Sequence, residues 1–328
     1  MKNVINTYAA YSKDEELRLK SSSGAMFSQL AFFVLETGGV VYGVAMSDDC
    51  YSAIYKRVCE KEELKYLRGS KYFQAKVGNT FRNVRADLEA GKNVLFTGTG
   101  CYVNGLKTFL GKEYDNLVCV DIVCHGTPSS KLWKEYVEYQ EKNLEAKLIY
   151  ASFRNKDRHN WAGFEMKEID SNYKEVYISR HIDPFFSLFV SNICLRPSCY
   201  NCIAKLDKLS DMTIADFWGI DDVAPEMNDN KGISLVLVRT KKGKKLFGSI
   251  TENLHIKEVT YEQGVAKNKS EYQSYEKPEN REQFFHDMNL MPFEKLYKKY
   301  LRIPLWKRIG RKVKILLKKI LMGGRLDT

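Results

Sequence analysis

The sequence contains no run of about 18 apolar residues, so it predicts no helix that spans a membrane. The first residues, MKNVINTYAAYSKDEE, lack the apolar stretch of a secretory signal, and we therefore expect a cytoplasmic protein. No internal repeat or low-complexity segment is visible. Of the 328 residues, 44% are hydrophobic and 12% are aromatic, which is enough for one large domain or two and excludes a disordered or fibrous chain.

Acidic residues are missing between Arg302 and Arg325, where there are nine basic residues. These nine account for most of the net charge of +11, so the rest of the chain carries only +2. A nucleic-acid protein more often spreads its basic residues over a reading surface. We therefore expect no nucleic-acid partner.

The same C-terminal segment has the pattern of a basic amphipathic helix. Its apolar residues recur at helical spacing and its lysines and arginines cover the remainder; the apolar set is Trp306, Ile309, Val313, Leu316, Leu317, Ile320 and Leu321. Such a helix suits an anionic membrane surface, which would place the protein at the inner membrane face. Docking on the domain itself or on a partner is the alternative.

The first part of the chain, residues 1–145, alternates between predicted helices and apolar strands. Apolar strands are expected at 40–46, 93–96 and 117–123, and helices at 25–37, 80–90, 103–110 and 129–143. This alternation predicts an α/β fold with a mainly parallel sheet and flanking helices.

The remainder of the chain changes character. Residues 146–255 predict a mixed α+β part, with a short helix at 183–191 and strands at 147–154, 164–169, 174–179, 212–217 and 233–239. Residues 256–328 predict a helical region that ends in the basic helix. No linker rich in proline, glycine or serine marks the division near residue 145.

Eight cysteines in a reducing compartment are not expected to form disulfides. Cys199 and Cys202 form a C-x-x-C, which fits a zinc knuckle, a redox dithiol or one edge of an iron–sulfur site. A redox dithiol normally opens a helix after a strand, whereas here Pro197 precedes the pair and no strand leads into it. The context therefore favours ligation of a metal.

Two further cysteines follow predicted strands. Cys101 comes after a glycine-rich turn and Cys124 ends the next apolar strand, so parallel strands would bring both thiols to one sheet edge. With Cys199 and Cys202 they could form a four-thiolate site, although a buried inert thiol is the alternative for Cys101 or Cys124 taken singly. Zinc usually binds between two short knuckles, so one knuckle and two isolated cysteines favour an iron–sulfur cluster. The other cysteines are expected to be core or surface thiols: Cys50, Cys59, Cys119 and Cys194.

Two loops could bind phosphate. Ser21, Ser22, Ser23 and Gly24 open an apolar helix, where hydroxyls, free backbone N–H groups and the helix dipole favour an anion. A plain serine N-cap is the alternative.

The second loop is formed by Thr97, Gly98, Thr99 and Gly100, which follow a strand and precede a helix; Val103 stands where a third glycine would complete a dinucleotide fingerprint. Two such loops suit a dinucleotide with a diphosphate, such as FAD. Lys71, in an Arg-Gly-Ser-Lys segment, adds positive charge or belongs to a solvated loop.

His125 follows Cys124 directly. Neighbouring residues on a strand point to opposite faces, so a Cys–His nucleophile pair is not expected, and His125 is interpreted as facing a flavin or bonding the backbone. Asp216, Phe217, Trp218 and Gly219 end another strand and could wall a flat cofactor or pack in the core.

Taken together, these segments resemble the beta subunit of coenzyme F420 hydrogenase/dehydrogenase over about residues 5 to 250. The resemblance is carried by an ordered set of motifs: Lys20-Ser21-Ser22-Ser23-Gly24, Gly69-Ser70-Lys71-Tyr72, Phe96-Thr97-Gly98-Thr99-Gly100-Cys101, Val120-Asp121-Ile122-Val123-Cys124-His125-Gly126, Arg196-Pro197-Ser198-Cys199-Tyr200-Asn201-Cys202 and Asp216-Phe217-Trp218-Gly219.

The resemblance implies a flavoprotein with FAD and a [4Fe–4S] cluster, which passes electrons between iron–sulfur centres and a small hydride-accepting organic substrate. The family cysteines match Cys101, Cys124, Cys199 and Cys202. Some relatives occur with polysaccharide-synthesis genes, so a role there is an expectation. The rival expectations are a non-catalytic accessory protein and a zinc-stabilised interaction protein of a membrane-associated glycan assembly.

The sequence departs from the family pattern in three places. No cysteine precedes Cys50, so the ferredoxin-like segment with which many relatives begin is absent, and the electron partner is expected to be a separate ferredoxin-like protein. Gly100 stands where the family commonly has proline, which makes the loop before Cys101 more flexible. Ala25 stands where it commonly has glycine, which narrows the approach of a phosphate to the backbone.

Overall fold

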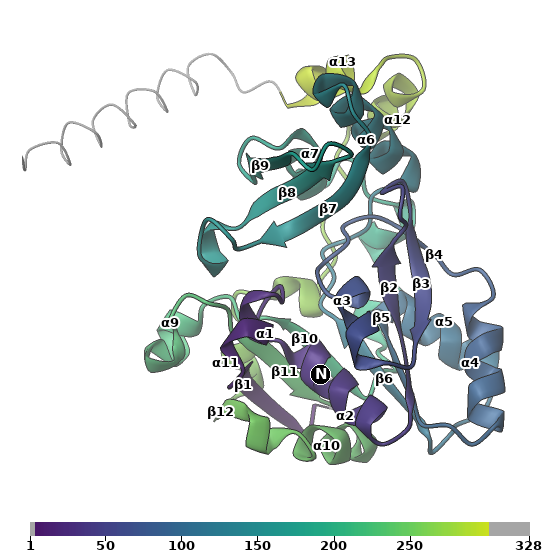
Figure 1. Cartoon of the computed structure of the whole chain (residues 1–328), viewed down its shortest axis with the longest axis vertical. Coiled ribbons are helices and arrows are strands. Elements are labelled where there is room, and N and C mark those ends of the chain that lie inside the picture. Colours follow the sequence, from purple (N-terminus) through teal and green to yellow (C-terminus); the bar gives the residue numbers. More distant parts are fainter. Residues whose placement is uncertain (1–3, 302–328) are drawn as a thin grey trace, which may run out of the picture.

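The computed structural model describes residues 4–301 and contains two sheets. A nine-stranded sheet has the order β12–β1–β11–β10–β6–β5–β2–β3–β4, and a three-stranded sheet has the order β7–β8–β9 (Figure 1). The strands of the large sheet are β1 (Asn6–Ser12), β2 (Val40–Met46), β3 (Ala53–Val58), β4 (Ala75–Lys76), β5 (Val94–Thr99), β6 (Leu117–Ile122), β10 (Met212–Asp216), β11 (Ser234–Val238) and β12 (Leu254–Val259). Those of the small sheet are β7 (Leu148–Asn155), β8 (Glu165–Asp170) and β9 (Glu175–Ser179).

Helices cover both sheets. They are α1 (Glu15–Leu19), α2 (Met26–Glu36), α3 (Leu64–Leu67), α4 (Thr80–Glu89), α5 (Gly100–Leu110), α6 (Ser130–Leu144), α7 (Pro184–Val190), α8 (Ile203–Leu206), α9 (Ile220–Val223), α10 (Lys241–Gly248), α11 (Tyr261–Val265), α12 (Arg281–Met288) and α13 (Phe293–Tyr300). The α/β class is confirmed, and the predicted helices in the first part are present with small shifts at their ends.

The centre of the large sheet is parallel and its flanks are mostly antiparallel. β2, β5, β6 and β10 run parallel, as expected for the first three, whereas β11, β1 and β12 pair antiparallel beyond β10, and β3 pairs antiparallel with β2. The sheet is therefore mixed and not mainly parallel. The sequence did not predict this, because the pattern of a strand does not encode the direction of its neighbour. The register aligns Thr99 with Ile122 and Ile122 with Ile214. Residues that follow these strands consequently emerge at one edge.

The small sheet shares a hydrophobic core with its helices and with the β3–β4 edge of the large sheet. Ser129 caps the N-terminus of α6, and its hydroxyl accepts a hydrogen bond from the Leu132 amide. Asp183 caps α7 through its side-chain carboxylate, and Pro184 occupies the first turn of that helix. Both helices bury aromatic side chains against the small sheet, where Trp133 and Tyr136 of α6 and Phe185 of α7 pack with Phe153 of β7. Burial of apolar surface stabilises a fold by about 25 cal/mol per Å², and this cluster therefore holds the small sheet and its helices together.

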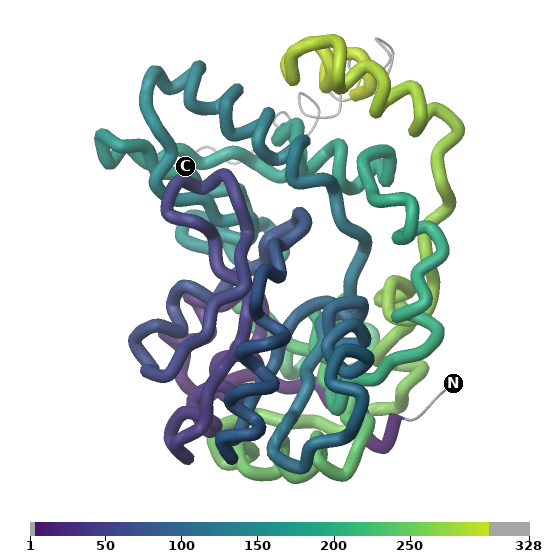
Figure 2. Tube along the Cα trace, turned by 90° about the vertical axis from the view of Figure 1, so that its right-hand side faces the viewer, coloured from purple at the N-terminus to yellow at the C-terminus, as the bar shows by residue number. Residues whose placement is uncertain are grey.

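The chain crosses between the two layers. It leaves the large sheet after β6, builds α6, the small sheet and α7, and returns at β10 (Figure 1). α12 and α13 then pack beside α6 and α7 at the far end from the N-terminus (Figure 2). The division into parts 1–145, 146–255 and 256–328 stays a prediction, since one sheet draws strands from both sides of residue 145. The expected basic helix lies outside the described residues.

Within residues 4–301, no helix has both the length and the apolar character needed to cross a bilayer.

Candidate functional site

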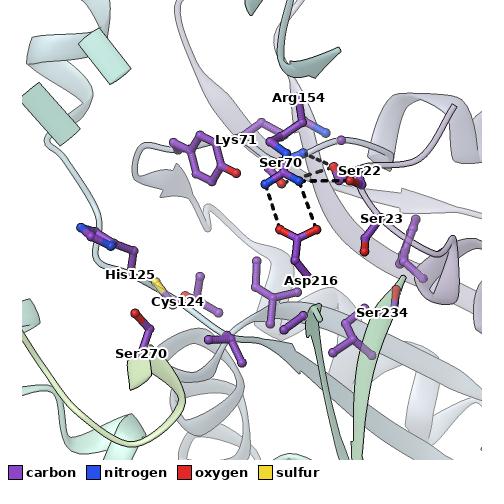
Figure 3. Close-up of a pocket in the computed structure, with 18 of the residues that line it drawn as sticks. Ser22, Ser23, Ser70, Lys71, Cys124, His125, Arg154, Asp216, Ser234 and Ser270 are labelled. Atoms are coloured by element: carbon purple, nitrogen blue, oxygen red, sulfur yellow. Dashed lines mark hydrogen bonds and ion pairs between the residues drawn. The ribbon is translucent and has the colours of Figure 1, made fainter. Parts of the chain in front are cut away.

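A cavity of about 850 Å³ lies between the carboxyl edge of the large sheet and the small sheet. Its walls come from the start of α2, the segment 67–73, the ends of β5, β6 and β10, the small sheet with α7, and the segment 266–275 (Figure 3). This is the edge at which open α/β sheets bind ligands, and the volume falls in the usual range of about 300–1,000 Å³ for cofactor and small-molecule sites.

The serine loop forms one wall. Ser21, Ser22 and Ser23 line the cavity, but each hydroxyl also has a partner in the protein. Ser21 Oγ donates to the carbonyl of Leu17 at 2.8 Å, Ser23 Oγ donates to that of Ile233 at 2.7 Å, and Ser22 Oγ lies 3.3 Å from Ser70 Oγ. The hydroxyls can still accept hydrogen bonds, so the loop offers a polar but preorganised wall.

Gly24 has a packing role. A Cβ atom at this position would lie 2.5 Å from the carbonyl oxygen of Ala10 and 2.9 Å from the amide of Ser234. Gly24 is not one of the described residues that line the cavity. The loop therefore needs glycine here in order to lie flat against β1 and β11.

The first turn of α2 is open to a ligand. Ala25 is its N-cap, adopts a left-handed conformation with φ of 67°, and makes no side-chain capping hydrogen bond. Ala25 and Met26 both line the cavity. The N–H groups of this turn and the helix dipole thus face a space that favours negative charge.

Lys71 lines the cavity, but its ammonium group is used elsewhere. It donates to the carbonyl oxygens of Tyr66, Leu67 and Arg68 at 3.2, 3.2 and 2.8 Å, and so caps the C-terminus of α3. Burial lowers the pKa of Lys71 to about 7. A role in contacting a cofactor stays a prediction.

The second loop is an extension of β5 that leads directly into α5. Thr97, Gly98 and Thr99 line the cavity, and their contact with a flavin stays a prediction. Thr97 Oγ1 donates to the carbonyl of Tyr42 at 3.0 Å, and Thr99 Oγ1 lies 3.1 Å from the sulfur of Cys101. A Cβ atom on Gly98 would lie 2.1 Å from the hydroxyl of Tyr55, so only glycine fits there.

The four predicted thiol ligands share one electrostatic neighbourhood. The pKa of the Cys124 thiol is raised to about 12, first by burial and then by Cys101, Cys199 and Cys202. Burial also raises the pKa of Cys199, with Cys202 and Cys101 adding to the effect. In the part of the chain that the structure describes, no three His, Cys, Asp or Glu side chains are placed so that they could hold a metal ion. The role of the four thiols as ligands stays a prediction.

These thiols differ in exposure. Cys101 in the first turn of α5 is exposed, whereas Cys124, Cys199 and Cys202 are half-buried, and Cys124 also lines the cavity. The other four cysteines are placed as expected, with Cys50, Cys119 and Cys194 buried and Cys59 exposed.

His125 lies on the cavity wall beside Cys124 (Figure 3). Its Nε2 atom lies 2.6 Å from the Asn192 side-chain oxygen, and its ring packs 4.7 Å from Phe189 and 4.1 Å from Tyr275 between centroids. Burial lowers the pKa of His125 to about 4, so the imidazole is neutral near pH 7. A neutral ring among aromatics suits contact with a flat, conjugated ligand.

The structure adds an ion pair that the sequence did not reveal. Arg154 of β7 binds Asp216 of β10 through two hydrogen bonds, of 2.8 and 3.2 Å, and both residues line the cavity (Figure 3). Trp161 donates its indole N–H to the same carboxylate at 3.1 Å and stacks on Trp218 with centroids 4.9 Å apart. Asp216 and Trp218 belong to a motif that the sequence analysis singled out. Arg154 carried no such signal, because it was only one charged residue within a predicted strand.

The fold and the cavity define an α/β protein with a ligand site at the carboxyl edge of its sheet. Two family models, which describe the two halves of the coenzyme F420 hydrogenase/dehydrogenase beta subunit, match the sequence. The model of the C-terminal half matches residues 91–263, and the model of the N-terminal half matches residues 7–81. The chain belongs to this family, whose members are oxidoreductases of the iron–sulfur and flavin kind. The predicted resemblance is confirmed.

A solved structure shows the same fold. It comes from a study described as "Xenon derivatization of the F420-reducing [NiFe] hydrogenase complex from Methanosarcina barkeri", with a TM-score of 0.54 and 16% sequence identity. The match covers 89% of this chain and 94% of that chain. No curated protein matches the sequence.

Proposed function

We propose that this protein passes electrons between a [4Fe–4S] cluster and a hydride-accepting organic substrate through FAD. The carrying observation is the cavity of about 850 Å³, whose walls contain eight of the nine residues predicted from the sequence to contact flavin: Ser21, Ser22, Ser23, Lys71, Thr97, Gly98, Thr99 and His125. These come from separate segments of the chain, so their convergence is a property of the tertiary structure.

The cavity suits a dinucleotide in charge as well as size. The open N-terminal turn of α2 and the basic side chains on the walls favour a diphosphate, and His125, Trp218 and Tyr275 provide flat apolar surfaces. FAD, when bound, would exchange a hydride with the substrate and single electrons with the cluster. The chain contributes placement: the Arg154–Asp216 pair fixes one wall, and the aromatic residues exclude water.

The four thiols suit a cluster in their chemistry and position. A single zinc ion with bonds of about 2.3 Å needs its four sulfur atoms in mutual contact. A cubane binds each thiolate through a different iron atom, so its four ligands lie further apart. Cys101, Cys124, Cys199 and Cys202 influence one another electrostatically, and Cys124 also lines the cavity, which supports a cluster next to the flavin.

The partners follow from this arrangement. Cys101 is exposed, so a cluster held there would lie near the surface, where a separate ferredoxin-like protein could give or accept electrons. The substrate would be a small conjugated molecule that reaches the flavin through the same cavity. Links to polysaccharide synthesis and to a membrane surface remain predictions.

The test is an ultraviolet–visible spectrum of protein purified without oxygen, with iron, sulfide, zinc and flavin measured on the same sample. We expect flavin bands, a broad shoulder that dithionite bleaches, and about four irons per chain. A colourless folded protein that holds zinc or no metal would contradict the proposal and favour an interaction protein.

A further inference from the structure

The cavity holds more positive charge than its own carboxylates neutralise. Among the described residues that line it, one is acidic, Asp216, and six are basic: Arg68, Lys71, Arg154, Arg180, Lys267 and Lys269. Four of the six are engaged within the protein, including Arg68, whose Nε atom donates to Ser28 Oγ at 3.2 Å. Arg154 pairs with Asp216, Lys267 pairs with Asp222, and Lys71 caps α3.

Arg180, which follows β9, shares an aromatic neighbour with Arg154. The guanidinium carbon of Arg180 lies 4.8 Å from the ring centroid of Phe164, and that of Arg154 lies 4.0 Å from the same centroid. Two permanent cations therefore meet at one ring, and only Arg154 has a carboxylate partner.

The charge of Arg180 is uncompensated within residues 4–301. No ion pair of this residue is present there, and its Nε atom is buried without a hydrogen-bond partner. Burial and the charge of Arg154 lower the pKa of Arg180, yet a guanidinium does not lose its proton in a protein. Arg180 is only partly buried, so water screens part of its charge, but a like charge beside it still costs stability unless an anion binds there.

Two further cations, Arg18 and Lys156, belong to the same charged neighbourhood as Arg154. Arg18 is paired with Asp229 through two hydrogen bonds, of 2.7 and 2.6 Å. Lys156 donates to the carbonyls of Arg18 and Lys231, and its pKa is lowered to about 7, chiefly by burial, so it can become neutral. Within the described residues, Arg180 thus has no carboxylate partner and cannot titrate, and, unlike that of Arg68, its Nε atom has no hydrogen-bond partner.

We propose that Arg180 is the anchor of an oxyanion subsite, which binds a phosphate or carboxylate group of a ligand in the cavity, beside the ring of Phe164. The inference rests on the proposed function for the identity of the ligand. The oxyanion belongs either to the diphosphate of the flavin dinucleotide or to an anionic group of the hydride-accepting substrate. A guanidinium offers several N–H donors in one plane, which suits either group.

The test compares Arg180→Met, Arg180→Lys and a control, Arg158→Met. Arg158 is also an arginine of the small-sheet region that lies over a ring, Tyr177, but it is mostly exposed and is not among the described residues that line the cavity. Flavin-free protein is titrated with FAD and with riboflavin, which lacks phosphate, by fluorescence quenching. If the diphosphate is the ligand, Arg180→Met weakens FAD binding about tenfold or more, leaves riboflavin unchanged, and is partly rescued by Arg180→Lys.

The second arm tests the substrate as the source. The flavin-loaded protein is photoreduced and reoxidised by a quinone, which takes two electrons and two protons to become a hydroquinone. If the subsite binds substrate, both flavin affinities stay unchanged. Arg180→Met then slows reoxidation by anthraquinone-2,6-disulfonate about tenfold but not by uncharged menadione.

Two results would overturn the proposal. One is an unchanged affinity and unchanged rate in every arm; the other is an equal loss of FAD and riboflavin, which means that Arg180 only shapes the wall. If the wild-type protein binds neither flavin, the proposed function fails. Calorimetry then measures whether pyrophosphate binds to the wild type and to Arg180→Met, which tests the oxyanion subsite by itself. Binding that Arg180→Met abolishes would then sustain the subsite, and no binding by the wild type would remove it.

A stability measurement separates a binding role from a structural one. Because Arg180→Met removes an unpaired charge and keeps an apolar chain beside Phe164, the ligand-free variant should melt at the same or a higher temperature than the wild type. A lower melting temperature together with unchanged ligand binding would assign Arg180 to folding and overturn the subsite.

Discussion

Asp216 at the end of β10 accepts two hydrogen bonds from the Arg154 guanidinium of β7, and this pair joins the large sheet to the small one across the cavity. The Arg154 side chain is 4% exposed and that of Asp216 is 18% exposed. The pair therefore fixes the spacing of the two layers where a ligand would enter.

Removing one partner of this pair should be strongly destabilising. Asp216→Asn leaves Arg154 buried without its counter-charge, and we expect a loss of about 3 kcal/mol in the free energy of unfolding. The double variant Asp216→Asn with Arg154→Met should recover part of that loss, because no unpaired charge remains. Urea denaturation of the wild type, the single variant and the double variant measures the loss of stability and its recovery. Lys134→Ala, which removes an exposed pair with Glu138, is the control and should cost less than about 1 kcal/mol. Equal losses for the single and double variants would contradict this account.

A buried proton is expected between Glu168 and Asp183. The hydroxyl of Tyr136 lies 2.7 Å from Glu168 and 2.8 Å from Asp183, yet it has only one proton to donate. Burial raises the pKa of Glu168 to about 7 and that of Asp183 to about 6. Both carboxyls bind protons more tightly in the folded state, so their contribution is complete below about pH 4 and is lost as pH rises towards 7. The free energy of unfolding should fall by on the order of 3 kcal/mol over this interval for one proton retained by the pair, at about 1.4 kcal/mol for each unit of pKa shift.

Glu168→Gln tests this prediction because a glutamine imitates the protonated acid. Its amide can donate to Tyr136 while its oxygen accepts from Gln140, which donates to Glu168 at 2.8 Å in the native protein. We expect the variant to be more stable than the wild type at pH 8 and to show a flatter dependence on pH. Chemical denaturation at a series of pH values is the measurement. A variant that is less stable at pH 8 would show that the fold favours the ionised Glu168 carboxylate, which contradicts a raised pKa.

Cys199→Ser should remove the cluster. Loss of one of four thiolates should abolish most of the bound iron and sulfide and lower the melting temperature, since metal sites couple to folding. Cys59→Ser is the matched control, because Cys59 is exposed and contacts Arg57 instead of the other four thiols. Iron and sulfide are measured on both variants after purification without oxygen. Full retention of both by Cys199→Ser would remove this residue from the ligand set.

Ala25→Gly should stabilise the protein. Ala25 has a φ of 67°, a region that costs a residue with a Cβ roughly 1–2 kcal/mol. Glycine relieves this strain but loses about 0.4–1 kcal/mol through the entropy of the unfolded chain, so the net gain should lie between about 0 and 1.6 kcal/mol. Thermal and urea unfolding measure the change. Because the variant also opens the first turn of α2, its affinity for FAD should equal or exceed that of the wild type. A clear loss of stability would mean that packing of the Ala25 methyl group outweighs the strain.

The sequence was sufficient for local structure because its signals are local. Serines and glycines bound α2, alternation of apolar strands and helices predicted the first part, and the ordered motifs identified the family. The strands β1 and β12 were not predicted from the sequence. They pair with each other, and β1 also pairs with β11, across more than 200 residues, and no local pattern encodes such a pairing.

The sequence by itself determined the α/β class, the family and eight of the residues that line the cavity. The tertiary structure decided how these residues are used. Lys71 caps a helix, Gly24 packs against β1, Arg154 finds its carboxylate 62 positions away, and Arg180 is left beside Arg154 without one. The physical reason is that charge compensation depends on distance in space, and only the folding of the small sheet over the edge of the large one sets those distances.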